Sequence, residues 1–143
     1  MEALARSGAE VRVVGGGEAA RQAALARSGL DVCEGLVDLG EAMEGCDLFV
    51  SHGSHGSVCQ TLLRGVPQLL VPLYREQERT ASKVEALGAG CAAEATRPAF
   101  DDVLAAALGD GALRAGARRF ADRHAGFSAA AAEADLAVRH TPL

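Results

Sequence analysis

The sequence predicts an α/β fold, a Rossmann-like parallel sheet with helices on both faces and a helical C-terminal tail. Short apolar runs, such as residues 48–51 and 68–71, alternate with helical patterns, and the connections are short and contain glycine. This alternation is typical of βαβ units, whose strands run parallel. The runs are apolar throughout rather than alternating with polar residues, as expected for strands covered on both faces.

Each element follows from the local pattern of apolar residues and stop signals. Strands are expected at residues 11–14, 31–33, 48–51, 68–71 and 91–93. Helices are expected at 18–28, 39–44, 55–64 (with Ser54 as a possible first residue) and 76–87, the last two closed by Gly65 and Gly88. After Pro98 the pattern is helical to the end, with breaks near residues 109–111 and Gly126. The first residues resemble the end of a helix, so the chain is expected to begin within the fold.

Length and composition restrict the class of protein. A chain of 143 residues with 49% hydrophobic residues forms one domain with a core. The net charge of −5 and the lack of a Lys/Arg cluster argue against a nucleic-acid binder. No apolar run is long enough to span a bilayer, and the N-terminus lacks the apolar region of a signal peptide. The four cysteines form no C-x-x-C pair. Together with the lack of a signal peptide, this favours a cytoplasmic protein with reduced thiols. We also expect no cofactor.

The segment Ser51–Ser57, with the sequence SHGSHGS, lies where a predicted strand turns into a predicted helix. Glycines let the backbone approach a ligand closely, and the free N–H groups of the helix then form an anion site. Ser54 and Ser57 can add hydroxyl donors and cap the helix, and His52 can donate to a phosphate oxygen. The segment therefore favours diphosphate binding without a lysine.

Other interpretations of the same segment stay open. Ser54 is equally suited to a plain helix cap, with incidental histidines. His52, His55 and Cys59 fall at spacings that suit a metal site, although no fourth ligand is evident. A serine hydrolase is excluded by the absence of a G-x-S-x-G motif. We expect no metal and no catalytic residue in this chain.

At residues 46–90 the chain reads CDLFVSHGSHGSVCQTLLRGVPQLLVPLYREQERTASKVEALGAG. This segment resembles the donor-binding signature of GT-B glycosyltransferases that use nucleotide sugars, similar to bacterial antibiotic and macrolide glycosyltransferases and plant UDP-glycosyltransferases. The resemblance extends from Leu36 to Gly90, and its motifs keep their relative spacing. It departs at several positions: Ser51 replaces a histidine, Asp38 a proline and Thr80 an asparagine.

The resemblance implies a role for individual residues. His52 falls on the histidine that contacts the donor diphosphate, and Gln60 falls where a glutamate binds the ribose hydroxyls. Four matches fall on the turn that cradles the phosphates: Gly53, Ser54, Gly56 and Ser57. Glu76 and Gln77 fall on the pair that holds the sugar hydroxyls. Leu36 and Val37 fall on the segment beside the nucleobase.

The implied function is binding of a UDP- or TDP-sugar for transfer to a small-molecule, natural-product acceptor. In the family, the acceptor pocket and the catalytic base belong to a separate N-terminal domain. Residues 1–143 are thus expected to form the donor-binding domain, without its first strand and without that partner domain. Such a domain would be inactive alone and could self-associate. Two alternatives remain, a donor-binding subunit of a split glycosyltransferase and a non-enzymatic nucleotide- or metal-binding module.

Overall fold

The computed structural model describes residues 4, 7–14, 22, 30–33, 37–94, 100–128 and 131–132. The elements in chain order are β1 (Val11–Val13), β2 (Leu30–Val32), α3 (Leu39–Ala42), β3 (Phe49–Ser51), α4 (His55–Leu63), β4 (Gln68–Leu70), α5 (Arg75–Ala86), β5 (Gly90–Ala92), α6 (Phe100–Gly109) and α7 (Gly111–Arg123). The expected strands and helices in these ranges are confirmed to within two residues at each end. The expected helix at 18–28 lies outside the described residues, apart from Gln22.

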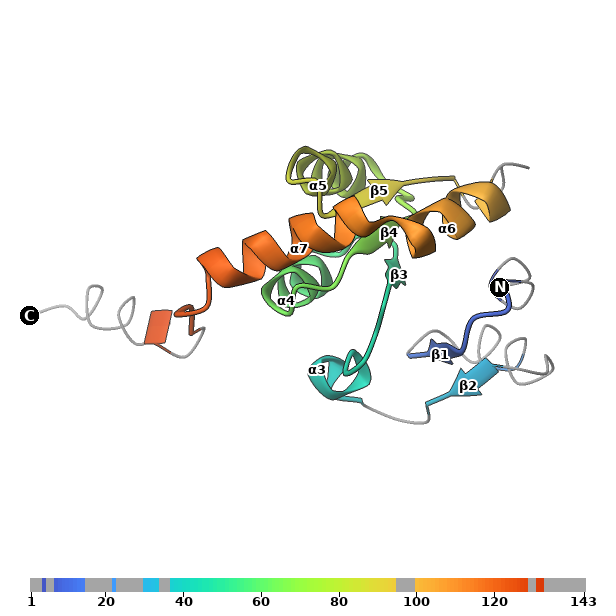
Figure 1. Ribbon diagram of the computed structural model, residues 1–143, viewed down its shortest axis with the longest axis horizontal. Coiled ribbons are helices and arrows are strands. Elements are labelled where there is room, and N and C mark those ends of the chain that lie inside the picture. The colour runs from blue at the N-terminus through green and yellow to red at the C-terminus, as the bar shows by residue number, and fades with distance from the viewer. Residues whose placement is uncertain are drawn as a thin grey trace, which may run out of the picture.

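The described strands form two parallel sheets. One sheet pairs β1 with β2, and the other has the order β3-β4-β5 (Figure 1). The parallel direction is confirmed, but no described strand joins β1 to β3. The predicted α/β fold with parallel strands is therefore confirmed, whereas the pairing order was not specified by the sequence, because local patterns specify strands and not their partners.

Helices cover both faces of the three-stranded sheet, and β4 lies between them with all its residues buried. Leu70 packs with residues of α4, α5 and α7, including Val58, Val84 and Ala117. Leu69 points to the opposite face and packs against Phe100 and Leu104 of α6. Successive side chains of a strand point to opposite faces, so β4 contributes to both halves of the core.

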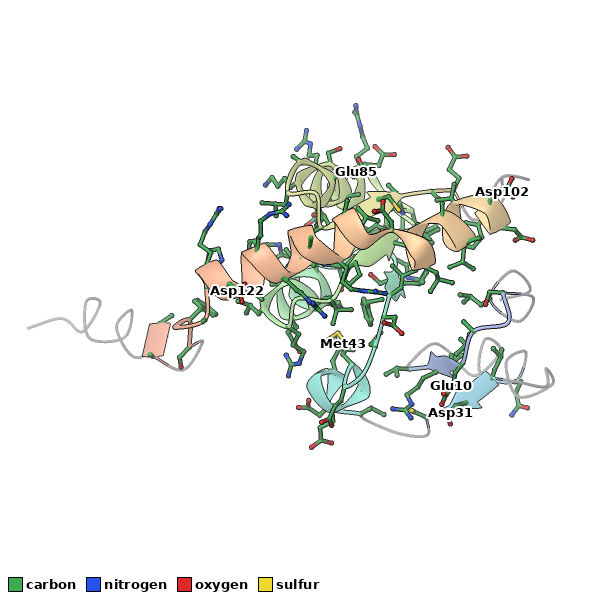
Figure 2. The ribbon with its side chains drawn as sticks, in the orientation of Figure 1. Glu10, Asp31, Met43, Glu85, Asp102 and Asp122 are labelled. Atoms are coloured by element: carbon green, nitrogen blue, oxygen red, sulfur yellow. The ribbon has the colours of Figure 1, made fainter. Side chains whose placement is uncertain are left out.

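Specific contacts fix the helices around this sheet. Gly65 and Gly88 adopt φ angles of 68° and 63° and end α4 and α5, a conformation that glycine adopts at no steric cost. Figure 2 labels Glu85 on α5, whose Oε1 accepts a hydrogen bond of 2.9 Å from the N–H of Ala92 in β5. None of the described helices is both long enough and apolar enough to cross a membrane.

Candidate functional site

The segment Ser51–Ser57, called the glycine–histidine turn from here on, begins at the carboxyl end of β3 and continues into the first turn of α4. Ligands of open parallel sheets bind at this end of the strands. Gly53 is buried and has a φ angle of 83°, which side-chain-bearing residues rarely adopt. The Oγ of Ser51 accepts a hydrogen bond of 3.2 Å from the Gly53 N–H and so holds the bend.

The first turn of α4 presents backbone N–H groups to solvent. The N–H groups of His55, Gly56 and Ser57 have no carbonyl partner within the helix, because an α-helix bonds each N–H to the residue four positions earlier. No acidic side chain lies in this first turn, and a Cβ on Gly56 would have no neighbour within 4 Å. The end of the helix is thus open and carries partial positive charge, which favours an anion.

Ser54 stands at the N-cap position of α4, but its side chain makes no capping hydrogen bond. Its hydroxyl instead pairs with the Ser57 hydroxyl at 2.8 Å. The prediction that Ser54 caps the helix through its side chain is wrong, because the neighbouring hydroxyl provides a partner at the helix spacing of three residues. The two exposed hydroxyls lie beside the free N–H groups, where they can add donors to a bound oxyanion.

The glycine–histidine turn lies against the start of α5. A Cβ on Gly53 would lie 3.7 Å from the backbone oxygen of Gln77 and 3.9 Å from its Cβ. The side-chain oxygen of Gln77 accepts a hydrogen bond of 2.8 Å from the Leu73 N–H, so this oxygen holds the loop that precedes α5. Its amide nitrogen remains the end that can donate to a ligand. Glu76 is exposed in the same first turn of the helix.

The chain matches a family model over residues 3–134, described as the C-terminal domain of proteins like erythromycin biosynthesis protein CIII. The chain belongs to this family. The resemblance found in the sequence is therefore confirmed, and the fold matches the C-terminal half of GT-B structures.

Solved structures agree with the family assignment. The chain is 30% identical to the glycosyltransferase SsfS6 of Streptomyces sp. SF2575, in a crystal structure complexed with thymidine diphosphate, with a TM-score of 0.71 over 88% of this chain and 32% of that chain. It is 27% identical to SnogD of Streptomyces nogalater, with a TM-score of 0.70 over 87% of this chain and 34% of that one.

Curated relatives include the L-demethylnoviosyl transferase of Streptomyces niveus, which is 34% identical over 92 residues, 62% of this chain and 24% of that protein. The NDP-glycosyltransferase YjiC of Bacillus subtilis is 44% identical over 50 residues, 35% of this chain and 13% of that protein. The chain thus spans about a third or less of the length of these relatives.

The structure places the other residues that the resemblance selects as follows. His52 is exposed within the turn, and Gln60 is exposed on α4. Val37 is half-buried just before α3, and Leu36 lies outside the described residues. The structure therefore places Gly53 of the diphosphate candidates next to Gln77 of the sugar candidates, since a Cβ on Gly53 would lie within 4 Å of Gln77.

The glycine–histidine turn is an open surface rather than an enclosed pocket. A cavity of about 560 Å³ lies elsewhere, between α3 and α7, and its lining includes Arg64, Arg114 and Arg118. A second, of about 580 Å³, lies beyond β4 and β5 and is lined by Pro72, Phe100 and neighbouring residues. Neither of these two cavities includes a residue of the turn.

The metal interpretation of the turn gains no support from the geometry. The Nε2 of His55 and the Sγ of Cys59 lie 3.8 Å apart, one helical turn from each other. Within the part of the chain that the structure describes, no three histidine, cysteine or acidic side chains gather as metal ligands. A zinc site needs at least three protein ligands, so this pair alone does not provide one.

Two residues of the site were not identified from the sequence. Ser51 supplies the hydroxyl that holds the bend, and Leu73 supplies the N–H that engages Gln77. A serine that precedes a glycine-containing turn often bonds the backbone two residues further on, so Ser51 carried a usable signal. A backbone N–H has no sequence signal, and the contact of Leu73 could not have been predicted.

Proposed function

We propose that the chain binds the diphosphate of a UDP- or TDP-sugar at the glycine–histidine turn, for transfer of the sugar to a small natural-product acceptor. The observation that carries the proposal is the open N-terminus of α4, with its exposed hydroxyl pair and His52 beside it. The complex of SsfS6 with thymidine diphosphate supports the choice of a nucleoside diphosphate. Membership in the family supports glycosyl transfer as the reaction.

The proposed roles divide between two helix ends. The N–H groups of α4, the Ser54–Ser57 pair and His52 bind phosphate oxygens, and charge developing on the leaving diphosphate is stabilised there. Glu76 and the amide nitrogen of Gln77 bind sugar hydroxyls next to the turn, because Gln77 lies within 4 Å of the position that a Cβ on Gly53 would take. Gln60 binds the ribose, and Leu36 and Val37 flank the nucleobase. The assignment of each residue to phosphate, sugar, ribose or nucleobase rests on the family resemblance.

Calorimetric titration with TDP and with a TDP-hexose tests the division of roles. Glu76→Ala should weaken binding of the TDP-hexose but leave the affinity for TDP unchanged, because Glu76 is assigned to the sugar. Glu78→Ala provides a matched control, since Glu78 is an exposed carboxylate on the same helix turn. If Glu76→Ala weakens both ligands equally, the sugar assignment is wrong.

Transfer itself should need more than these 143 residues. The family resemblance assigns the acceptor pocket and the catalytic base to another domain, and the turn here is open to solvent. We expect the purified chain to bind donor without transferring sugar. Transfer by the purified chain to any small-molecule acceptor would contradict this part of the proposal.

A further inference from the structure

The first turns of α4 carry a thiol beside an imidazole, a pairing that the proposed donor chemistry does not use. His55 and Cys59 are four residues apart on one helix and therefore share a face. Their Nε2 and Sγ atoms are 3.8 Å apart, with His55 exposed and Cys59 partly exposed. A neutral imidazole can accept the thiol proton, which leaves the thiolate, the nucleophilic form of cysteine.

The other three cysteines lack this arrangement. Burial raises the pKa of Cys46 and of Cys91, which favours the protonated thiol over the thiolate in both. Cys33 lies near Arg12, a cation that favours a thiolate but is paired with Asp31 at 2.8 Å and, unlike an imidazole, cannot take up the thiol proton. All four are free of disulfides. Cys59 is thus the cysteine with an imidazole in contact and a path to solvent.

We propose that Cys59 is a modification site that exchanges with low-molecular-weight disulfides such as oxidised glutathione, and that the mixed disulfide blocks the glycine–histidine turn. The thiol proton passes to the His55 Nε2, and the thiolate attacks one sulfur of the disulfide. A new S–S bond forms as the old one breaks, and the departing glutathione thiolate takes up the proton. No electrons are gained or lost overall, because one disulfide replaces another.

The blocking effect follows from charge and position, and it rests on the proposed function. Cys59 lies one helical turn C-terminal to His55 on α4. The backbone N–H of His55 is one of the N–H groups at the helix start that have no carbonyl partner within the helix. An attached glutathionyl group carries carboxylates into the region that a diphosphate would occupy. Like charges repel, so these carboxylates should weaken the binding of a diphosphate. Reduction of the mixed disulfide restores the free thiol and the open turn.

The thiol chemistry is tested by treating the full chain with oxidised glutathione and measuring, by proteolysis and mass spectrometry, the rate at which each cysteine is modified. Cys59 should react at least about tenfold faster than Cys46 or Cys91. His55→Gln should slow Cys59 severalfold and leave the other rates unchanged. His124→Gln is the matched control, because His124 contacts Phe120 on α7 instead. Equal rates at Cys59 and Cys91, or no effect of His55→Gln, would overturn the proposal.

The blocking effect has a separate readout, calorimetric titration with TDP. The glutathionylated chain should lose TDP binding, and dithiothreitol should restore it. Cys59→Ser should bind TDP equally well before and after treatment. If the modified chain binds TDP as tightly as the reduced chain, the blocking effect is wrong. If the reduced chain binds no TDP, the proposed donor site fails and the block with it, whereas the modification rates still decide the thiol chemistry.

Discussion

The two sheets of this chain differ in how completely their strands are packed. All residues of β4 are buried, with α6 on one face and α4, α5 and α7 on the other. In β1 and β2 the outer residues are half-buried and the middle residues, Arg12 and Asp31, are exposed and pair with each other. The glycine–histidine turn and Gln77 both belong to the well-packed sheet. The proposed diphosphate and sugar positions therefore depend on the β3-β4-β5 sheet and the helices packed on it.

Several substitutions measure how far this difference extends, beginning with the largest expected effect. Leu69→Ala should lower the free energy of unfolding by about 3–5 kcal/mol, because it leaves a cavity in a fully buried position. Val13→Ala in β1 should cost about 1 kcal/mol or less, since Val13 is only half-buried. Urea unfolding of both variants compares the two sheets. Equal losses would show that the sheets are equally packed.

A glycine on α7 tests the close packing around the well-packed sheet. A Cβ at Gly116 would clash with the backbone oxygen of Gly88, so Gly116→Ala must displace α7 or the end of α5. We expect a loss of about 1–3 kcal/mol in the free energy of unfolding.

Gly111→Ala is the matched control for that substitution, because its Cβ would meet nothing within 4 Å. On the same helix it should be neutral or stabilising by up to about 1 kcal/mol. Thermal unfolding followed by circular dichroism separates the two variants. A Gly116→Ala protein as stable as the parent would contradict the observed contact between α7 and the end of α5.

Within the β3-β4-β5 sheet, β3 pairs with β4 on one side only, and its other side is an open edge among the described strands. The Phe49 N–H donates to the Pro67 carbonyl and the Ser51 carbonyl accepts from the Val71 N–H, just before and after β4, so the N–H and carbonyl of Val50 face the edge that no described strand covers. Such an edge favours pairing with another chain. We expect the chain to self-associate through it at high concentration.

Val50→Pro removes the N–H at that edge without removing a bond to β4, and it should shift the chain toward the monomer. Val50→Ala loses similar side-chain packing but keeps the N–H, so it should still associate. Light scattering over a range of concentrations distinguishes the variants. A parent chain that stays monomeric throughout, or equal association by both variants, would show that the edge of β3 is not the contact.

The sequence predicted the strands and helices closely because each is bounded by a local signal, such as Gly65 or Gly88 in a conformation that glycine favours. It predicted the position of the glycine–histidine turn for the same reason. It did not specify which strands pair with which, since local patterns define strands but not their partners. Nor did it predict that Ser54 bonds Ser57 instead of the helix N–H groups, because exposed hydroxyl partners differ little in free energy.

The central claim, that the glycine–histidine turn binds the donor diphosphate, is tested most directly by titrating TDP against the parent, His52→Ala and His124→Ala. His52→Ala should weaken binding by about 1–3 kcal/mol through loss of a hydrogen bond to phosphate. Its free energy of unfolding should stay unchanged, because the His52 side chain is exposed. His124→Ala should bind like the parent, since His124 lies at the end of α7. Equal TDP affinity for His52→Ala and the parent would contradict the claim.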